Sequence, residues 1–327
     1  MEHITKKRLL LVAGRGNMEL SEEIAACMGE PLGEIMLSTF ANGELYCRYG
    51  ESVRGADAFI LQSHSEPIND HIMEQLIMID AAKRASAKRI TAVCPFYAYA
   101  RQDRKAQGRE PITARLVADL LSVAGADRVV TVDLHTGQIQ GFFDFPVDHL
   151  TAVPLLAKTI AESVEGEVTV VSPDAGGGKL ARRYANHLAD FDIQAELAFI
   201  DKRRPKGTHN VAEAVEVVGD VEGRVCVLVD DMIDTAGTIV SAAELLAKRG
   251  AADVVVAATH GVLSGPAVDR LKNAPIREVV VSNTLTIPSE KQFDALRVVS
   301  IAPVIAEALT AVFAETSVSE IFRGDNV

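Results

Sequence analysis

Short runs of Val, Ile and Leu alternate along the chain with segments whose apolar residues recur at helical spacing. Most of the short runs are continuously apolar, which is typical of parallel strands buried on both faces. They predict strands at Leu9–Ala13, Ala58–Gln62, Ile90–Cys94, Val129–Asp133, Val168–Ser172, Val225–Asp230, Val254–Thr259 and Glu278–Ser282. The helical pattern predicts helices at Asp70–Ala87, Ile112–Ala124, Ala152–Ser163, Gly178–Leu188, Ile239–Lys248 and Val304–Phe313. This alternation predicts a doubly wound α/β fold, with mainly parallel sheets flanked by helices.

The order of these runs indicates that one α/β unit occurs twice. Three pairs of segments correspond in order: 9–14 with 168–173, 59–64 with 227–231, and 128–132 with 277–281. A chain of 327 residues is also long for one domain and natural for two. We therefore expect an N-terminal domain over residues 1–150, completed by the C-terminal segment 304–327, and a C-terminal domain over residues 151–303.

The most informative chemistry follows the apolar run that begins at Val225. This run ends in two adjacent carboxylates, Asp230 and Asp231, before a short loop and a helical pattern. In open parallel sheets, ligands bind where strands end and helices begin. Free N–H groups at a helix start form a phosphate site, here with the hydroxyls of Thr235 and Thr238 beside them. The carboxylates can hold sugar hydroxyls or a hydrated metal, so the segment predicts a ribose 5-phosphate site. The structural alternative is a buried strand followed by an acidic, capped helix start.

Other polar clusters also follow predicted strands. Residues 97–105, Tyr-Ala-Tyr-Ala-Arg-Gln-Asp-Arg-Lys, could stack on a purine and pair with phosphates, or form a solvated loop. Asp133 and His135 stand two residues apart at a strand end, so we expect them to share a face, where they could bind a divalent ion. Residues 200–210 form a basic patch in an acidic chain. The glycine-rich segment 172–179 is not a Walker A loop, because Leu180 follows Lys179.

Charge and cysteine usage narrow the functional class. A net charge of −12 argues against nucleic-acid binding, whereas phosphorylated ligands remain possible if Mg²⁺ supplies the positive charge. The 4 cysteines contain no C-x-x-C pair, which favours free thiols in a reducing compartment. The apolar run Leu9–Ala13 is too short for a signal sequence or a membrane span. We therefore expect a cytoplasmic protein with no membrane partner.

The motifs together resemble one enzyme family. Residues 225–238 resemble the signature of the phosphoribosyl-binding superfamily, which contains type I phosphoribosyltransferases and ribose-phosphate pyrophosphokinases. The strings at 97–105 and 133–148 resemble the pyrophosphokinases in particular, and the resemblance extends from about Leu9 to Phe322. The chain is identified as a member of the phosphate-activated class I ribose-phosphate pyrophosphokinases. This implies two tandem phosphoribosyltransferase-like domains and synthesis of 5-phosphoribosyl 1-diphosphate (PRPP) and AMP from Mg-ATP and ribose 5-phosphate.

The resemblance also implies a role for individual residues. Catalytic charges in a mobile loop would come from Lys202 and Arg204. ATP would be bound by Arg101 and Gln102, and by Asn42, Gly43 and Glu44 from a neighbouring subunit. Ribose 5-phosphate would be bound by Arg204, Asp230, Asp231, Asp234, Thr235, Ala236, Gly237 and Thr238. Two Mg²⁺ ions would be organised by Asp133, His135 and Asp174. Phosphate as activator and ADP as inhibitor would bind near Ser52, Arg54, Ser317 and Ser319 in a homo-oligomer, expected to be a hexamer.

Two segments depart from the family pattern. Gly178, Lys179 and Leu180 replace the usual residues after the paired glycines, and residues 206–209 lengthen the basic loop. Two other functions therefore stay open: a type I phosphoribosyltransferase, and a non-catalytic regulator associated with the synthetase. The two-part chain and the strings at 97–105 and 133–148 argue against the former. The presence of His135, Lys202 and Arg204 argues against the latter.

Overall fold

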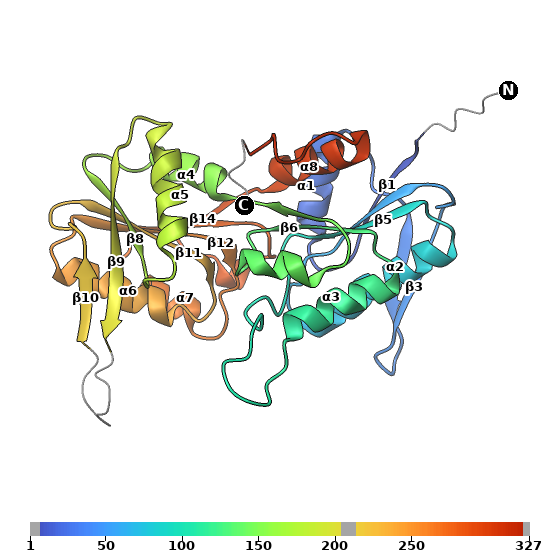
Figure 1. Ribbon diagram of the computed structural model, residues 1–327, viewed down its shortest axis with the longest axis horizontal. Helices are drawn as coiled ribbons and strands as arrows, with labels where there is room; N and C mark the ends of the chain where they lie inside the picture. The colour runs from blue at the N-terminus through green and yellow to red at the C-terminus, as the bar shows by residue number, and fades with distance from the viewer. Residues whose placement is uncertain (1–6, 204–213, 323–327) are drawn as a thin grey trace. The chain divides into compact units, whose positions relative to one another are not determined.

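The computed structural model describes residues 7–203 and 214–322, without the side chains of residues 202, 203, 214 and 215. The chain folds into two compact units. Unit 1 comprises Met1–Thr151, Thr284–Thr286 and Ser300–Val327, and unit 2 comprises Ala152–Asn283 and Ile287–Val299. Each unit contains a mainly parallel sheet with helices on both faces, which confirms the predicted α/β class (Figure 1).

Unit 1 is built on a five-stranded parallel sheet. Its strands lie in the order β1 (Leu9–Ala13), β4 (Asp57–Leu61), β5 (Arg89–Cys94), β6 (Arg128–Val132) and β7 (Val147–Leu150). Helices α1 (Met18–Met28) and α8 (Ala302–Ala314) cover one face, and α2 (Ile68–Arg84) and α3 (Thr113–Ala124) cover the other (Figure 1). Every residue of β4 is buried, as expected for a central parallel strand.

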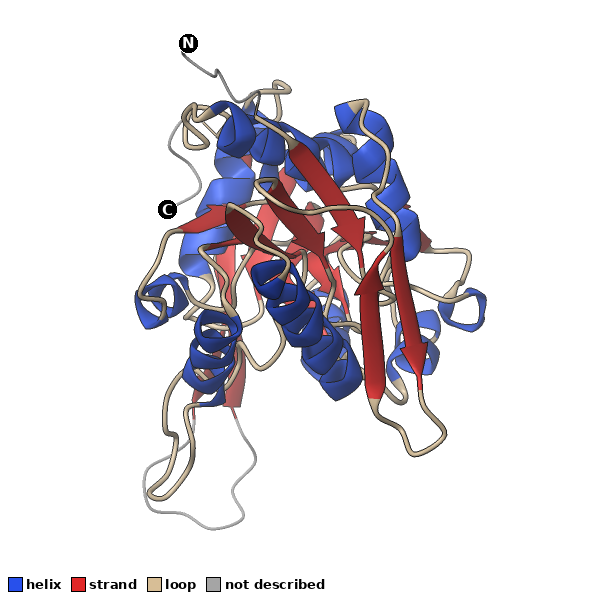
Figure 2. Cartoon of the chain, turned by 90° about the vertical axis from the view of Figure 1, so that its right-hand side faces the viewer, coloured by secondary structure: helices blue, strands red, loops and turns tan. Residues whose placement is uncertain are grey.

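A separate antiparallel hairpin, β2 (Ile35–Thr39) and β3 (Leu45–Tyr49), belongs to unit 1, and Figure 2 shows the two strands side by side. The Tyr49 hydroxyl donates to the Met78 carbonyl on α2 at 3.0 Å and so attaches the hairpin to the body of the unit. A short 3-10 helix, η1 (Gly137–Phe142), precedes β7.

Unit 2 contains a seven-stranded sheet. Its strands lie in the order β10 (Ala214–Val218), β9 (Ala195–Arg203), β8 (Val168–Ser172), β11 (Val225–Ile233), β12 (Asp253–Gly261), β13 (Glu278–Ser282) and β14 (Leu296–Val299). Among these described strands, β10 alone runs antiparallel to its neighbour. Helices α4 (Val153–Ala161) and α5 (Gly178–Ala189) cover one face, and α6 (Gly237–Lys248) and α7 (Ala267–Lys272) cover the other; η2 (Ser289–Lys291) precedes β14.

The two sheets share one topology. The order β1-β4-β5-β6-β7 in unit 1 matches β8-β11-β12-β13-β14 in unit 2, strand for strand along the chain. The three pairs of similar segments in the sequence fall on equivalent strands: β1 and β8, β4 and β11, β6 and β13. One strand order therefore occurs in both units.

Candidate active site

The predicted ribose 5-phosphate segment begins at the end of a central strand of unit 2. Strand β11 is buried through Cys226–Val229 and continues past Asp230 and Asp231 to Ile233, which is farther than the sequence predicted. Both aspartates are partly exposed, and the backbone of Asp230 pairs with Ala258 of β12. The strand thus delivers two carboxylates to its carboxyl end, where α/β sheets bind ligands.

The loop that follows turns its carbonyl groups toward the segment after β12. The carbonyls of Ile233, Asp234 and Thr235 accept from Leu263 N (2.9 Å), Ser264 N (3.0 Å) and Arg270 Nη1 (2.8 Å), respectively. Arg270 is a residue that sequence reasoning missed, because its short helix α7 was not predicted. With these carbonyls bonded on one side, the loop has a fixed backbone at the start of α6.

Helix α6 begins with backbone N–H groups that the helix itself cannot bond. Its N-cap residue is Ala236, in the left-handed conformation at φ 59°, and within the described chain no side chain caps this helix start. Gly237 and Thr238 form the first turn, whose N–H groups have no partner inside a helix. Thr235 and Thr238 are exposed beside them. This arrangement of N–H and hydroxyl donors suits a phosphate group.

The carboxylates of this site are crowded. The Asp231 backbone N–H donates to Asp230 Oδ1 at 2.9 Å. Burial, repulsion from Asp231 and a smaller repulsion from Asp174 raise the pKa of Asp230 to about 7. A cation, or hydroxyl groups that donate to these oxygens, would stabilise the ionised pair. The site therefore combines donors for an anion with acceptors for hydroxyls or a metal ion.

Asp174, predicted as a metal ligand, has a second role in the structure. Its Oδ1 accepts from Gly176 N at 2.7 Å and Gly177 N at 2.9 Å, just before α5 begins. Ser172 Oγ donates to the Asp174 carbonyl at 2.6 Å. The unusual segment from Gly178 onward forms the first turn of α5, so the departure from the family pattern falls at a helix start.

Arg101 and Gln102, the predicted ATP residues, lie in unit 1 on the loop between β5 and α3. Both side chains are exposed. The Gln102 carbonyl accepts from Ala114 N at 3.2 Å, and Gln102 Oε1 accepts from Thr113 Oγ1 at 2.5 Å. The start of α3 therefore holds Gln102 in a defined position.

The prediction that Asp133 and His135 share a strand face is wrong. Strand β6 ends at Val132, and Asp133 takes a left-handed backbone conformation at φ 35°. This turn breaks the alternation of the strand, so that Asp133 is buried while His135 is exposed. Their use as metal ligands stays a prediction.

The other predicted ATP residues lie on the β2–β3 hairpin, and one of the two predicted catalytic residues lies in β9. Asn42, Gly43 and Glu44 form the exposed β2–β3 turn, where Gly43 has φ 92° and Glu44 N donates to Asn42 Oδ1 at 3.2 Å. Lys202 lies in β9, without a described side chain, and Arg204 lies outside the described residues.

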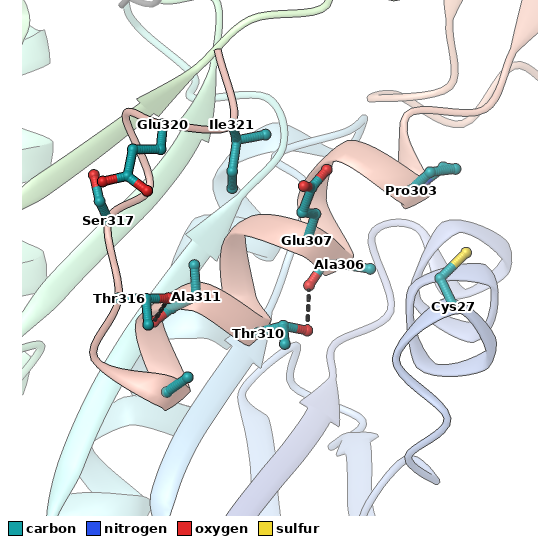
Figure 3. A pocket seen from close by; sticks show the side chains of 11 residues that line it. Cys27, Pro303, Ala306, Glu307, Thr310, Ala311, Thr316, Ser317, Glu320 and Ile321 are labelled. Atoms are coloured by element: carbon teal, nitrogen blue, oxygen red, sulfur yellow. Dashed lines mark hydrogen bonds between the residues drawn. The ribbon is translucent and has the colours of Figure 1, made fainter. Parts of the chain in front are cut away.

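The predicted regulatory residues are all exposed: Ser52 and Arg54 before β4, and Ser317 and Ser319 after α8. Ser317 lines a groove of about 770 Å³ in unit 1, formed by α8, the segment after it and Cys27 of α1 (Figure 3). Glu307 and Glu320 also line the groove, and no Lys or Arg is among its described lining residues. The described lining therefore presents two carboxylates beside Ser317.

Two features are absent from the part of the chain that the structure describes. Within residues 7–203 and 214–322, no group of three His, Cys, Asp or Glu side chains is arranged to hold a metal ion. No helix in the same ranges has the length and apolar character needed to span a membrane.

The fold and sequence agree with those of known proteins. The N-terminal domain of ribose phosphate pyrophosphokinase matches residues 9–125, and the phosphoribosyl synthetase-associated domain matches residues 176–323. Ribose-phosphate pyrophosphokinases of Streptomyces avermitilis and Mycobacterium tuberculosis are 56% and 54% identical, over 97% and 98% of this chain and 97% of each relative. The crystal structure of phosphoribosylpyrophosphate synthetase from Mycobacterium smegmatis has a TM-score of 0.89 at 54% identity, covering 94% of this chain and 100% of that one. The chain belongs to the ribose-phosphate pyrophosphokinase family.

Proposed function

We propose that this enzyme transfers the diphosphoryl group of Mg-ATP to the 1-hydroxyl of ribose 5-phosphate, giving PRPP and AMP for nucleotide biosynthesis. The observation that carries the proposal is the uncapped start of α6 directly after the paired carboxylates of β11, in a chain of this family. A phosphate at the helix start and hydroxyls at the carboxylates match the two ends of ribose 5-phosphate. We further propose that the two units correspond to the two tandem domains expected from the sequence.

On the sugar side, the backbone N–H groups of Gly237 and Thr238 would bind the 5-phosphate, together with the hydroxyls of Thr235 and Thr238. Asp230 and Asp231 would accept from the 2- and 3-hydroxyls, directly or through metal-bound water. Held at both ends, the sugar presents its 1-hydroxyl in one orientation, and such positioning supplies much of the catalysis in phosphoryl transfer.

On the nucleotide side, Arg101 and Gln102 would bind ATP. Lys202 and Arg204 would contact the diphosphoryl group as its charge redistributes. By analogy with arginine fingers, contacts of this kind contribute roughly 10³–10⁵ in rate, or about 4–7 kcal/mol. They would also exclude water and so limit ATP hydrolysis.

The residues present fit magnesium. Mg²⁺ binds oxygen ligands and usually uses one or two carboxylates plus water and substrate phosphates, so a site of three protein ligands is not required. Asp230 and Asp231 offer such oxygens, and the raised pKa of Asp230 marks a place where a cation is favourable. By family resemblance, His135, Asp133 and Asp174 would hold the two ions expected. The ions, when bound, neutralise phosphate charge.

Several finer properties belong to the same proposal. A neighbouring subunit of a hexamer would contribute Asn42, Gly43 and Glu44 to the ATP site. Phosphate would activate and ADP would inhibit through Ser52, Arg54, Ser317 and Ser319. A cytoplasmic location is consistent with the four free cysteines, and no nucleic-acid or membrane partner is expected.

One assay tests the activity. Purified enzyme with Mg²⁺, ATP and ribose 5-phosphate, and no nucleobase, should form AMP and PRPP in equal amounts, and phosphate should increase the rate. A phosphoribosyltransferase would form no AMP under these conditions. A non-catalytic regulator would consume neither substrate, with or without phosphate, and that result would refute the proposal.

A further inference from the structure

The loop that carries Arg101 and Gln102 is hydrogen-bonded to a buried histidine, which follows a different strand. His64 comes after β4 and is completely buried, although sequence reasoning assigned it no role. Its backbone N–H donates to the Phe96 carbonyl at 3.3 Å, and its ring atom Nδ1 accepts from Ala98 N at 3.1 Å. Backbone and side chain of one residue thus hold two points at the start of the 96–102 loop.

These contacts fix the protonation state of the ring. Because Ala98 N–H is a donor, Nδ1 must be unprotonated, and the proton of the neutral ring lies on Nε2. Nε2 faces Gln75 Oε1 on α2 at 2.9 Å, and the Gln75 amide in turn donates to the Ile60 carbonyl at 3.3 Å. The acceptor that the loop uses is therefore oriented by α2 and β4, both outside the loop.

Further hydrogen bonds follow along the same loop. Tyr97 OH donates to the Ala114 carbonyl at 2.9 Å, and Tyr99 takes a left-handed conformation at φ 61°. Gln102 N then donates to the Tyr99 carbonyl at 2.8 Å. Ala98 directly precedes this Tyr99–Gln102 turn, so we expect a shift at Ala98 to move the turn as well.

We propose that His64 is a positioning residue, whose Nδ1 acceptor sets the 96–102 backbone for ATP binding by Arg101 and Gln102. The inference rests on the proposed function for the role of ATP, but the contact itself can be measured without turnover. Ribose 5-phosphate is assigned to the α6 start, so its binding should be independent of His64.

Two substitutions of His64 test the roles of the two ring nitrogens separately. His64→Asn places an acceptor near the position of Nδ1, whereas His64→Gln places its polar group near Nε2. In the full-length enzyme, His64→Gln should raise KM for ATP about tenfold, because the buried Ala98 N–H loses its acceptor. In His64→Asn, KM for ATP should stay within about threefold of the wild-type value. In both variants, KM for ribose 5-phosphate should stay within about twofold of the wild-type value. Cys94→Ala is the matched control, because Cys94 Sγ donates to the same Gln75 Oε1 at 3.3 Å from β5, outside the loop.

Amide hydrogen exchange gives the second measurement. The Ala98 and Gln102 amides should exchange about tenfold faster in His64→Gln than in wild type or His64→Asn, since exchange reports the loss of their protection. Three results would overturn the inference: equal effects of His64→Asn and His64→Gln, equal changes in the KM values for both substrates, or the same rise in KM for ATP in Cys94→Ala. If wild-type enzyme forms no AMP, the proposed function fails, while the exchange rates still decide whether Nδ1 holds the loop.

Discussion

Acidification should destabilise unit 1 through the neutral ring of His64. Burial, offset in part by the bond to Gln75 and reinforced by the nearby His71, lowers the pKa of His64 from 6.5 to about 4. Between these values the unfolded chain binds a proton that the folded chain excludes, so stability should rise with pH across this range. The contribution of His64 is therefore fully present above pH 6.5 and is lost as the pH falls toward 4.

The two pKa values set the size of the effect. At pH 7.5 the ring is neutral in both the folded and the unfolded chain, so the loss of folding stability is close to zero. At pH 5 the unfolded ring is mostly protonated, and the difference amounts to about 2 kcal/mol. Below pH 4 it approaches about 3.4 kcal/mol, which is 1.36 kcal/mol for each of the 2.5 pKa units between 6.5 and 4. The neighbouring groups Cys94 and Tyr97 have raised pKa values from burial and stay neutral throughout this range.

Urea unfolding at pH 7.5 and pH 5 measures the effect in wild type and His64→Asn. Tyrosine fluorescence follows unit 1, because the chain has no Trp and four of its five tyrosines (Tyr46, Tyr49, Tyr97 and Tyr99) lie in that unit, with Tyr184 in unit 2. Wild type should lose about 2 kcal/mol more than the variant between the two pH values, since the other histidines are common to both proteins. Equal losses in the two proteins would show that His64 is not held neutral, and the assigned tautomer would be wrong.

Three further predictions concern the proposed active site. Thr238→Val should raise KM for ribose 5-phosphate about 10- to 150-fold, because one hydroxyl donor to a charged phosphate is lost. KM for ATP should stay nearly unchanged. Steady-state kinetics with each substrate varied in turn will check both expectations. Lys202→Ala and Arg204→Ala should each lower kcat by at least about 100-fold, with smaller changes in substrate Kd. Turnover assays measure the former and equilibrium binding measures the latter. A near-normal kcat would mean that the basic segment only increases solubility. His135→Ala should lower turnover without changing the urea midpoint, since the side chain is exposed, and excess Mg²⁺ should restore part of the rate; a lowered midpoint would indicate a structural histidine instead.

The central strands could be predicted because burial on both faces leaves a continuous apolar run. Strand β4 is an example, with all of its residues buried. Strands β2 and β3 were missed because they are partly exposed and pair with each other, apart from the main sheet. Helix α7 was missed because its six residues are too few to show a helical period.

The segment proposed to bind phosphate could be located because its residues are contiguous and lie between a strand and a helix. Contacts between distant segments left no such signal. Arg270 supports Thr235 across 35 positions, and His64 supports Ala98 across 34. The prediction that Asp133 and His135 share a strand face failed for a different reason, since strand alternation cannot show where a left-handed residue ends the strand.

The duplicated loops show how one topology serves two purposes. In unit 2 the β11–α6 loop bonds its carbonyls to the segment after β12, which leaves the donors at the helix start for an anion. In unit 1 the equivalent β4–α2 loop buries His64 and places an acidic residue, Asp70, in the first turn of α2. A carboxylate at a helix start occupies the favourable field that a phosphate would need. The α2 start is therefore less suited to an anion than the α6 start, and the β4–α2 loop instead contributes the buried His64, which accepts from Ala98 N of the neighbouring loop.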